Sequence, residues 1–140
     1  MIYFGKMSDI TNDFDEIWAI VRSMQIKPQT KTSNVIQVSA LAPSKELFHK
    51  YLNWRADGEW NEETFKNKYT PLFLQEMNTE YAQNYLNNLY KKGQQKDILI
   101  VCYCVNEKMC HKGIIKELLE DKCKKDGIEN ICYDVKKKSR

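Results

Sequence analysis

The 140-residue chain has no apolar run that approaches the roughly 20 residues needed to span a bilayer. The longest such run, Ile98 to Cys104, has only the length of a strand. The first residues, Met-Ile-Tyr-Phe-Gly-Lys, lack the basic start, the long apolar segment and the small-residue cleavage site of a signal peptide. We therefore expect a cytoplasmic protein with no membrane segment.

The chain also lacks internal repeats, low-complexity tracts and any convincing linker. A hydrophobic content of 42% predicts a packed core. A chain of 140 residues has the length of one domain, which we expect over residues 1–135. The net charge of +3 is too small to indicate nucleic acid as a partner. Its basic excess lies mainly in residues 136–140, which we expect to form a solvated, disordered tail.

Glycine and proline are scarce, with five and three residues, whereas lysine and asparagine are abundant. This composition is typical of an AT-rich phage or a low-GC bacterium. The five cysteines are odd in number and gather toward the C-terminal end instead of spreading as a disulfide framework would. In a reducing compartment, such cysteines are more often buried, catalytic or metal-binding than cross-linked.

Apolar and β-branched runs at residues 1–4, 34–39, 98–104 and 128–135 predict about four strands. Helical spacing and capping residues predict helices over residues 14–24 and 45–54, beginning at Asn61 and Thr79, and from about Cys110 to the cap at Gly127. This alternation indicates an α/β fold, a small and mostly parallel sheet with helices on both faces. About 55 residues separate the second and third strands, which predicts a helical insertion beside the sheet.

Ligands of such sheets bind beyond the carboxyl ends of the strands. We therefore expect the loops after Phe4, Ser39 and Cys104 to share one rim. Residues two apart on a strand face the same side, so Cys102 and Cys104 point together, with Cys104 nearer the rim. Three of the five cysteines and one of the two histidines fall between residues 102 and 111.

Cys110, His111 and Lys112 are expected in the first turn of the following helix. Backbone N–H groups and the helix dipole favour negative charge there, on a thiolate or on a bound anion. Folding a helix start requires no such cluster of titratable groups. The triplet therefore indicates function, whereas Cys102 is more simply a core residue, because cysteine is often buried.

Three chemistries fit this segment. The first is a nucleophilic cysteine, Cys104 or Cys110, with His111 as its base. The second is an anion pocket in which Lys112 binds a phosphorylated ligand without reaction. The third is a zinc site formed by Cys102, Cys104, Cys110 and His111. Its spacing is not that of a familiar zinc knuckle, so we expect no metal.

A thiol phosphatase or rhodanese loop is disfavoured, because those loops need an arginine at fixed spacing after the cysteine, and six residues after Cys104 the chain has Cys110. We expect Cys104, Cys110 and His111 to be catalytic. Ser39 and Ser44 flank a loop on the same rim, and with Lys112 they are the expected ligand-binding residues. Ser44 also fits a helix cap.

The segment Cys-Tyr-Cys-Val-Asn-Glu-Lys-Met-Cys-His-Lys at residues 102–112 resembles the strand-Cys-turn-Cys-His-Arg signature of the YeaO-like family of small prokaryotic and phage proteins. Leu41-Ala-Pro-Ser44 and the run from Asn61 to Tyr69 match that family in the same order. The resemblance implies a three-layer α/β fold with the cysteine–histidine loop at the rim, but no settled activity or cofactor.

Lys112 stands where that family has arginine. Lysine keeps the positive charge but loses the planar fork that grips a carboxylate or phosphate with two hydrogen bonds. Together, these patterns predict a protein that binds a nucleotide-like or other anionic small molecule at the rim. If a cysteine of the segment is nucleophilic, the protein also processes that molecule. The alternative is a non-catalytic protein that sequesters a ligand or binds a host or self protein.

Overall fold

The computed structural model describes residues 1–22, 35–103 and 107–135, and the expected tail at 136–140 lies outside these ranges. In the described residues, five parallel strands form one sheet in the order β3-β2-β4-β1-β5. The strands are β1 (Ile2–Lys6), β2 (Glu16–Ala19), β3 (Val35–Gln37), β4 (Ile98–Cys102) and β5 (Cys132–Asp134). The predicted parallel α/β sheet is confirmed, with one strand more than expected.

The additional strand is β2, and the helix predicted over residues 14–24 is wrong. Ile17, Trp18, Ala19 and Ile20 are all buried, with at most 2% of each residue exposed. A helix at the surface would alternate buried and exposed positions, whereas a strand inside a sheet covered on both faces is buried continuously. The pairing of β2 with β3 and β4 outweighs the helical spacing of its apolar residues.

β4 lies between β1 and β2, and all five of its residues are buried. Helices α4 (Glu80–Gly93) and α5 (His111–Asp126) cover one face of the sheet. There, Tyr85 of α4 contacts Trp18 of β2. The opposite face carries the short 3₁₀ helix η1 (Met7–Asp9) and Phe14, whose ring meets that of Tyr3. In the described residues, the helices α4 and α5 thus lie on one face, and the short η1 is the helical element on the other.

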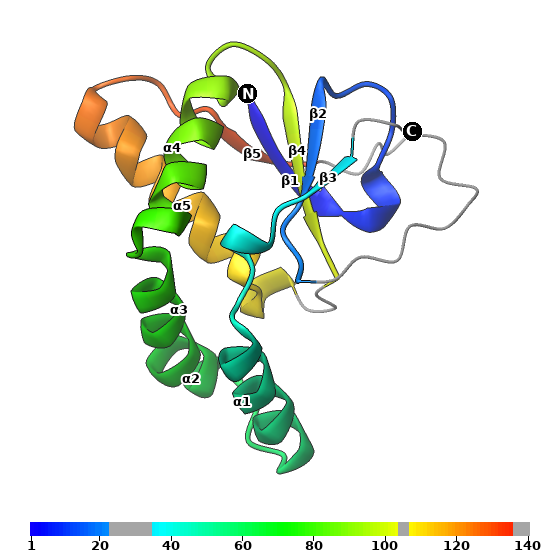
Figure 1. The fold of residues 1–140 in the computed structure, drawn as a ribbon, viewed down its shortest axis with the longest axis vertical. Helices are drawn as coiled ribbons and strands as arrows, with labels where there is room; N and C mark the ends of the chain where they lie inside the picture. Colours follow the sequence, from blue (N-terminus) through cyan, green and yellow to red (C-terminus); the bar gives the residue numbers. More distant parts are fainter. Residues whose placement is uncertain (23–34, 104–106, 136–140) are drawn as a thin grey trace.

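The helical insertion lies between β3 and β4 in the chain. Besides α4 it consists of η2 (Ser39–Leu41), α1 (Lys45–Ala56), α2 (Glu62–Thr64), the π-helical turn η3 (Phe65–Tyr69) and α3 (Thr70–Met77). Its helices α1, α2 and α3 lie beyond the carboxyl ends of the strands, whereas α4 lies beside the sheet (Figure 1). Side chains of Ser44, Asn61 and Thr79 cap helices as predicted. No described helix is long and apolar enough to cross a membrane.

The π turn explains how the chain accommodates Pro71. A proline inside an α-helix lacks the N–H donor and its ring clashes with the carbonyl four residues earlier. The wider turn of η3 directly precedes Pro71, which is in the first turn of α3. The helical path therefore continues past the proline, and α3 packs against α5 at the rim of the sheet.

Candidate functional site

The cysteine–histidine segment lies where β4 gives way to α5. Cys102 ends β4, and Cys110 is the N-cap of α5, with its sulfur accepting a hydrogen bond from the backbone N–H of Lys112 at 3.4 Å. His111 and Lys112 are the first two helical residues. The 3₁₀ helix η4 (Glu107–Met109) precedes Cys110. The expected placement of the triplet at a helix start is confirmed.

The sulfur atoms of Cys102 and Cys110 lie 3.2 Å apart. Both residues are buried, with 3% and 2% exposed. Cys110 is disulfide-bonded in the structure, whereas Cys102 remains a thiol. Cys110 can therefore act as a nucleophile or a metal ligand only in the reduced protein, since both roles need its thiolate.

The imidazole of His111 is held by a backbone carbonyl. Its Nε2 lies 2.8 Å from the carbonyl oxygen of Ile20, the residue after β2. A carbonyl oxygen can only accept, so Nε2 carries the hydrogen and Nδ1 of the neutral ring has the lone pair. Nδ1 lies 3.8 Å from the sulfur of Cys110. The ring is thus oriented with its basic nitrogen toward the sulfur atoms.

His111 is neutral at physiological pH. Burial lowers the pKa of its imidazole to about 4, and the positive charge of Lys112 acts in the same direction. The hydrogen bond to Ile20 opposes this effect without cancelling it. The ring of Phe73 on α3 packs edge-on against the imidazole at 5.6 Å between centroids, so the helical insertion helps to exclude water from it.

Donor atoms of Cys102, Cys110 and His111 all lie within 4.8 Å of one another. We call these three residues the cysteine–histidine cluster. A neutral imidazole beside a thiol can accept its proton and leave a thiolate nucleophile. Two thiolates and an imidazole are also ligands that soft and borderline metal ions prefer.

Lys112 connects the cluster to a neighbouring cavity. Its side chain is buried, with 4% of the residue exposed, and its Nζ donates a hydrogen bond of 2.6 Å to the carbonyl oxygen of Gly5 in β1. A side chain at Gly5 would collide with Asp9, whose Oδ2 lies 2.7 Å from the position of an added Cβ. Glycine thus lets η1 fold back closely against the end of β1.

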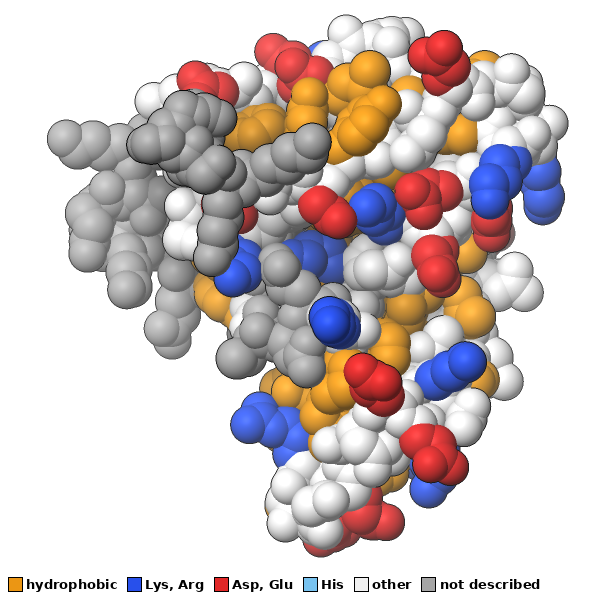
Figure 2. All heavy atoms as spheres, turned by 180° about the vertical axis from the view of Figure 1, so that it is seen from behind, with side chains coloured by type: hydrophobic (Ala, Val, Ile, Leu, Met, Phe, Trp, Pro, Cys, Tyr) orange, Lys and Arg blue, Asp and Glu red, His pale blue; other side chains and the backbone are white. Residues whose placement is uncertain are grey.

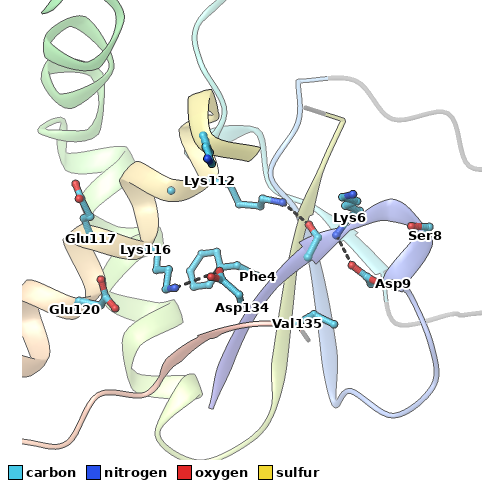
Figure 3. A pocket seen from close by; sticks show the side chains of 13 residues that line it. Phe4, Lys6, Ser8, Asp9, Lys112, Lys116, Glu117, Glu120, Asp134 and Val135 are labelled. Atoms are coloured by element: carbon cyan, nitrogen blue, oxygen red, sulfur yellow. Dashed lines mark hydrogen bonds and ion pairs between the residues drawn. The ribbon is translucent and has the colours of Figure 1, made fainter. Parts of the chain in front are cut away.

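The cavity encloses about 590 Å³ at the carboxyl ends of β1 and β5, and Lys112 lines it from α5 (Figure 3). Lysines 6, 108, 112 and 116 and acidic residues Asp9, Glu117, Glu120 and Asp134 contribute to its wall. Lys116 pairs with Asp134 at 3.2 Å, and Asp9 accepts the backbone N–H of Lys6. Glu117 and Glu120 lie farther along α5 than Lys112 (Figure 3).

A family model described as the active DUF488-N3 subclade matches residues 2–123. The chain belongs to this family. YeaO is itself a DUF488 protein, so the resemblance to a YeaO-like domain is confirmed. No curated protein and no solved structure matches the chain. The matched range runs from β1 into α5 and therefore contains the cluster and Lys112.

The DUF488-N3 chain brings Cys110, His111 and Lys112 together, and adds Cys102, which the sequence assigned to the core. Cys104 lies outside the described residues. Ser39 begins η2 and Ser44 caps α1, and neither lines the cavity at β1. Both polar groups of Ser44 also contact Glu76 of α3.

Sequence reasoning missed three partners of the site in the DUF488-N3 chain, namely the carbonyls of Gly5 and Ile20 and the ring of Phe73. Backbone carbonyls have no signature in a sequence. The one available signal was Gly5, which predicts a turn out of the first strand. A glycine there also allows another segment to approach the backbone closely at the end of β1. Phe73 follows helical spacing and looks like any other core residue.

Proposed function

We propose that the protein binds a nucleotide-like or other anionic small molecule in the cavity at the end of β1, and that the cysteine–histidine cluster beside it carries out chemistry on that ligand. The observation that carries this proposal is the buried Lys112, which lines the cavity at the start of α5. A buried ammonium group beside a helix N-terminus favours a negative partner.

The position of the cavity supports ligand binding. In parallel α/β sheets, ligands lie beyond the carboxyl ends of the strands, where connections leave on opposite faces of the sheet. Here the chain leaves β1 through η1 on one face and leaves β4 toward α5 on the other. Acidic and basic side chains are interspersed on the face in Figure 2, which suits a small ligand better than a long polyanion.

Lys112 would serve equally well in a protein that binds a ligand without changing it chemically. The three residues of the cluster are at least nine-tenths buried and none of them lines the cavity, whereas Lys112 does. This burial favours a ligand-sequestering protein as the second candidate function. The description of the matching family as active supports catalysis instead.

A ligand screen tests the first part of the proposal. Reduced protein is titrated calorimetrically with nucleoside mono-, di- and triphosphates and with inorganic phosphate, and any ligand that binds is then measured with variants. We expect Lys112→Met to weaken binding by roughly tenfold or more, since a charged hydrogen bond is lost. Lys50→Met, on the exposed surface of α1, is the matched control.

Lys116→Met is a second variant for the case that Lys112→Met folds poorly, because Lys116 lines the same cavity and is less buried. Binding by wild-type protein that neither substitution weakens would contradict the proposal. The same holds if none of these anions binds. Mass spectrometry of the ligand after incubation then separates the two functions: a changed ligand indicates an enzyme, and an unchanged one indicates sequestration.

A further inference from the structure

We propose that, in the reduced protein, Cys102, Cys110 and His111 form a binding site for a thiophilic divalent metal ion such as Zn²⁺. The inference concerns the cluster to which the proposed function assigns chemistry, but it does not depend on anion binding, because none of the three residues lines the cavity at β1. It rests on donor type, spacing, orientation and burial.

The spacing of the donor atoms fits a tetrahedral ion. With Zn–S bonds of about 2.3 Å and Zn–N bonds of about 2.0 Å, neighbouring ligand atoms lie roughly 3.5 to 3.8 Å apart. The two sulfur atoms are 3.2 Å apart, and Nδ1 of His111 is 3.8 Å from the sulfur of Cys110. Movements of about 0.3 to 0.6 Å bring the two pairs that Cys110 forms to coordination distance. The remaining pair, Cys102 and His111, lies within 4.8 Å and must close by up to about 1.3 Å, which side-chain rotation can supply.

The orientation of His111 is that of a metal ligand. A ligating imidazole almost always donates its second ring N–H to a carbonyl or carboxylate, which fixes the ring and its tautomer. In this chain the carbonyl oxygen of Ile20 accepts the hydrogen of Nε2, so Nδ1 carries the lone pair that a metal ion requires. The arrangement is in place before any ion enters.

Burial and donor type select the class of ion. Two thiolates and one imidazole suit zinc and other thiophilic ions, whereas Mg²⁺ and Ca²⁺ need oxygen donors. The cluster has 2% to 7% of its residues' surface exposed, so its sulfur atoms are shielded from bulk water. The described residues supply three ligands, the number that catalytic zinc sites use when the fourth position is left for water or substrate.

Metal binding requires reduced Cys110. Reduction of its disulfide by an added phosphine takes up two electrons and two protons and returns two thiols, while the phosphine is oxidised to its oxide. Each cysteine then loses its proton to the solvent when it binds the ion. Oxidised protein is therefore the internal negative control.

Cobalt is the probe that tests the site, because Co²⁺ bound by thiolates gives sulfur-to-metal charge-transfer bands. Protein reduced by a phosphine and stripped of metal is titrated with Co²⁺ and then with Zn²⁺. We expect one equivalent of Co²⁺ to bind with those bands, and Zn²⁺ to displace it. Cys102→Ser and His111→Gln are expected to weaken binding by at least about tenfold.

Cys123→Ser is the matched control, since Cys123 is a buried thiol on the same helix but outside the cluster. It should bind Co²⁺ as the wild type does, and Zn²⁺ should raise the melting temperature of both. The proposal is overturned if reduced wild-type protein shows no charge-transfer bands, or if Cys102→Ser binds as tightly as Cys123→Ser. Should Cys102→Ser fail to fold, the wild-type cobalt spectrum and the Zn²⁺-dependent melting temperature decide alone.

Discussion

Nε2 of His111 lies 2.8 Å from the carbonyl oxygen of Ile20, although the two residues are 91 positions apart in the chain. This hydrogen bond joins the first turn of α5 to the segment that follows β2. It satisfies a buried carbonyl and fixes the tautomer of a buried imidazole. The cysteine–histidine cluster is therefore part of what holds the rim together.

The first prediction concerns the pH dependence of stability in metal-free protein. The pKa of His111 is 6.5 in the unfolded chain and about 4 in the folded one. The unfolded state therefore binds more protons between these values, and stability falls as the pH drops from 6.5 toward 4. Above pH 6.5 the contribution is fully present. The expected loss is on the order of 3 kcal/mol, measured by urea unfolding at a series of pH values with a chelator present.

His49 provides the control for this experiment, because it is the only other histidine and lies exposed on α1. His49→Gln should keep the fall in stability between pH 6.5 and 4. His111→Gln should be less stable at pH 7 and should show a flatter profile in the same interval. If both variants keep the wild-type slope, His111 is not the group that titrates.

Much of the site's position follows from the sequence because its signals are local. The apolar run of β4, the cysteine–histidine–lysine triplet and the glycine cap at Gly127 are short patterns with direct physical causes. Gly127 has φ of +66°, the left-handed conformation that glycine adopts without strain. Such patterns located the helix start of α5 to within one residue.

The parts that could not be predicted depend on long-range contacts. β2 has the apolar spacing of a helix, and only its pairing with β3 and β4 selects the strand. Cys102 has the features of a core residue, and nothing local indicates that its sulfur lies 3.2 Å from that of Cys110. The carbonyl of Ile20 becomes a partner of His111 only because β2 lies next to β4 in the sheet.

The second prediction separates two roles of Ser44. Its hydroxyl accepts the N–H of Leu47 and donates to Glu76, and its own N–H donates to Glu76 at 2.8 Å. Ser44→Ala should therefore lower the free energy of unfolding by about 1 to 2 kcal/mol, through loss of the cap and of the contact with α3. Affinity for an anion bound at Lys112 should stay unchanged, as measured by calorimetry. A tenfold weaker affinity in well-folded protein would show that Ser44 binds the ligand.

The third prediction concerns the contact of α4 with the sheet. A Cβ added at Gly93 would lie 2.6 Å from Cδ1 of Ile2, which is fully buried in β1. Gly93→Ala should therefore destabilise the protein by about 1 to 3 kcal/mol, because the helix must move away from the core. Gly113→Ala is the opposite case, since no atom of the residues that the structure describes lies within 4 Å of its added Cβ.

In Gly113→Ala the better helix propensity of alanine should dominate, raising stability by up to about 1 kcal/mol. Both values are measured by urea unfolding at pH 7. Equal effects of the two substitutions would mean that α4 does not approach β1 as closely as the structure has it.

The last prediction lies at the opposite end of the sheet, where Glu16 begins β2. Burial raises the pKa of Glu16, but hydrogen bonds from Lys96, Trp18 and Lys92 outweigh this and lower it from 4.5 to about 2. The stabilisation is therefore present above pH 4.5 and is lost as the pH falls toward 2. Apart from an overlap between pH 4 and 4.5, this interval lies below that of His111, so the two groups can be distinguished.

Glu16→Gln should reduce the free energy of unfolding at pH 7 by about 1 to 2 kcal/mol, a modest value because the two lysines are 34% and 39% exposed and solvent screens their charges. The gap between variant and wild type should narrow as the pH falls below 4.5, and should also shrink in high salt. Glu129→Gln, at an exposed position before β5, should show neither effect. A gap for Glu16→Gln that is constant from pH 7 to pH 3 would indicate that the carboxylate's charge does not stabilise the fold.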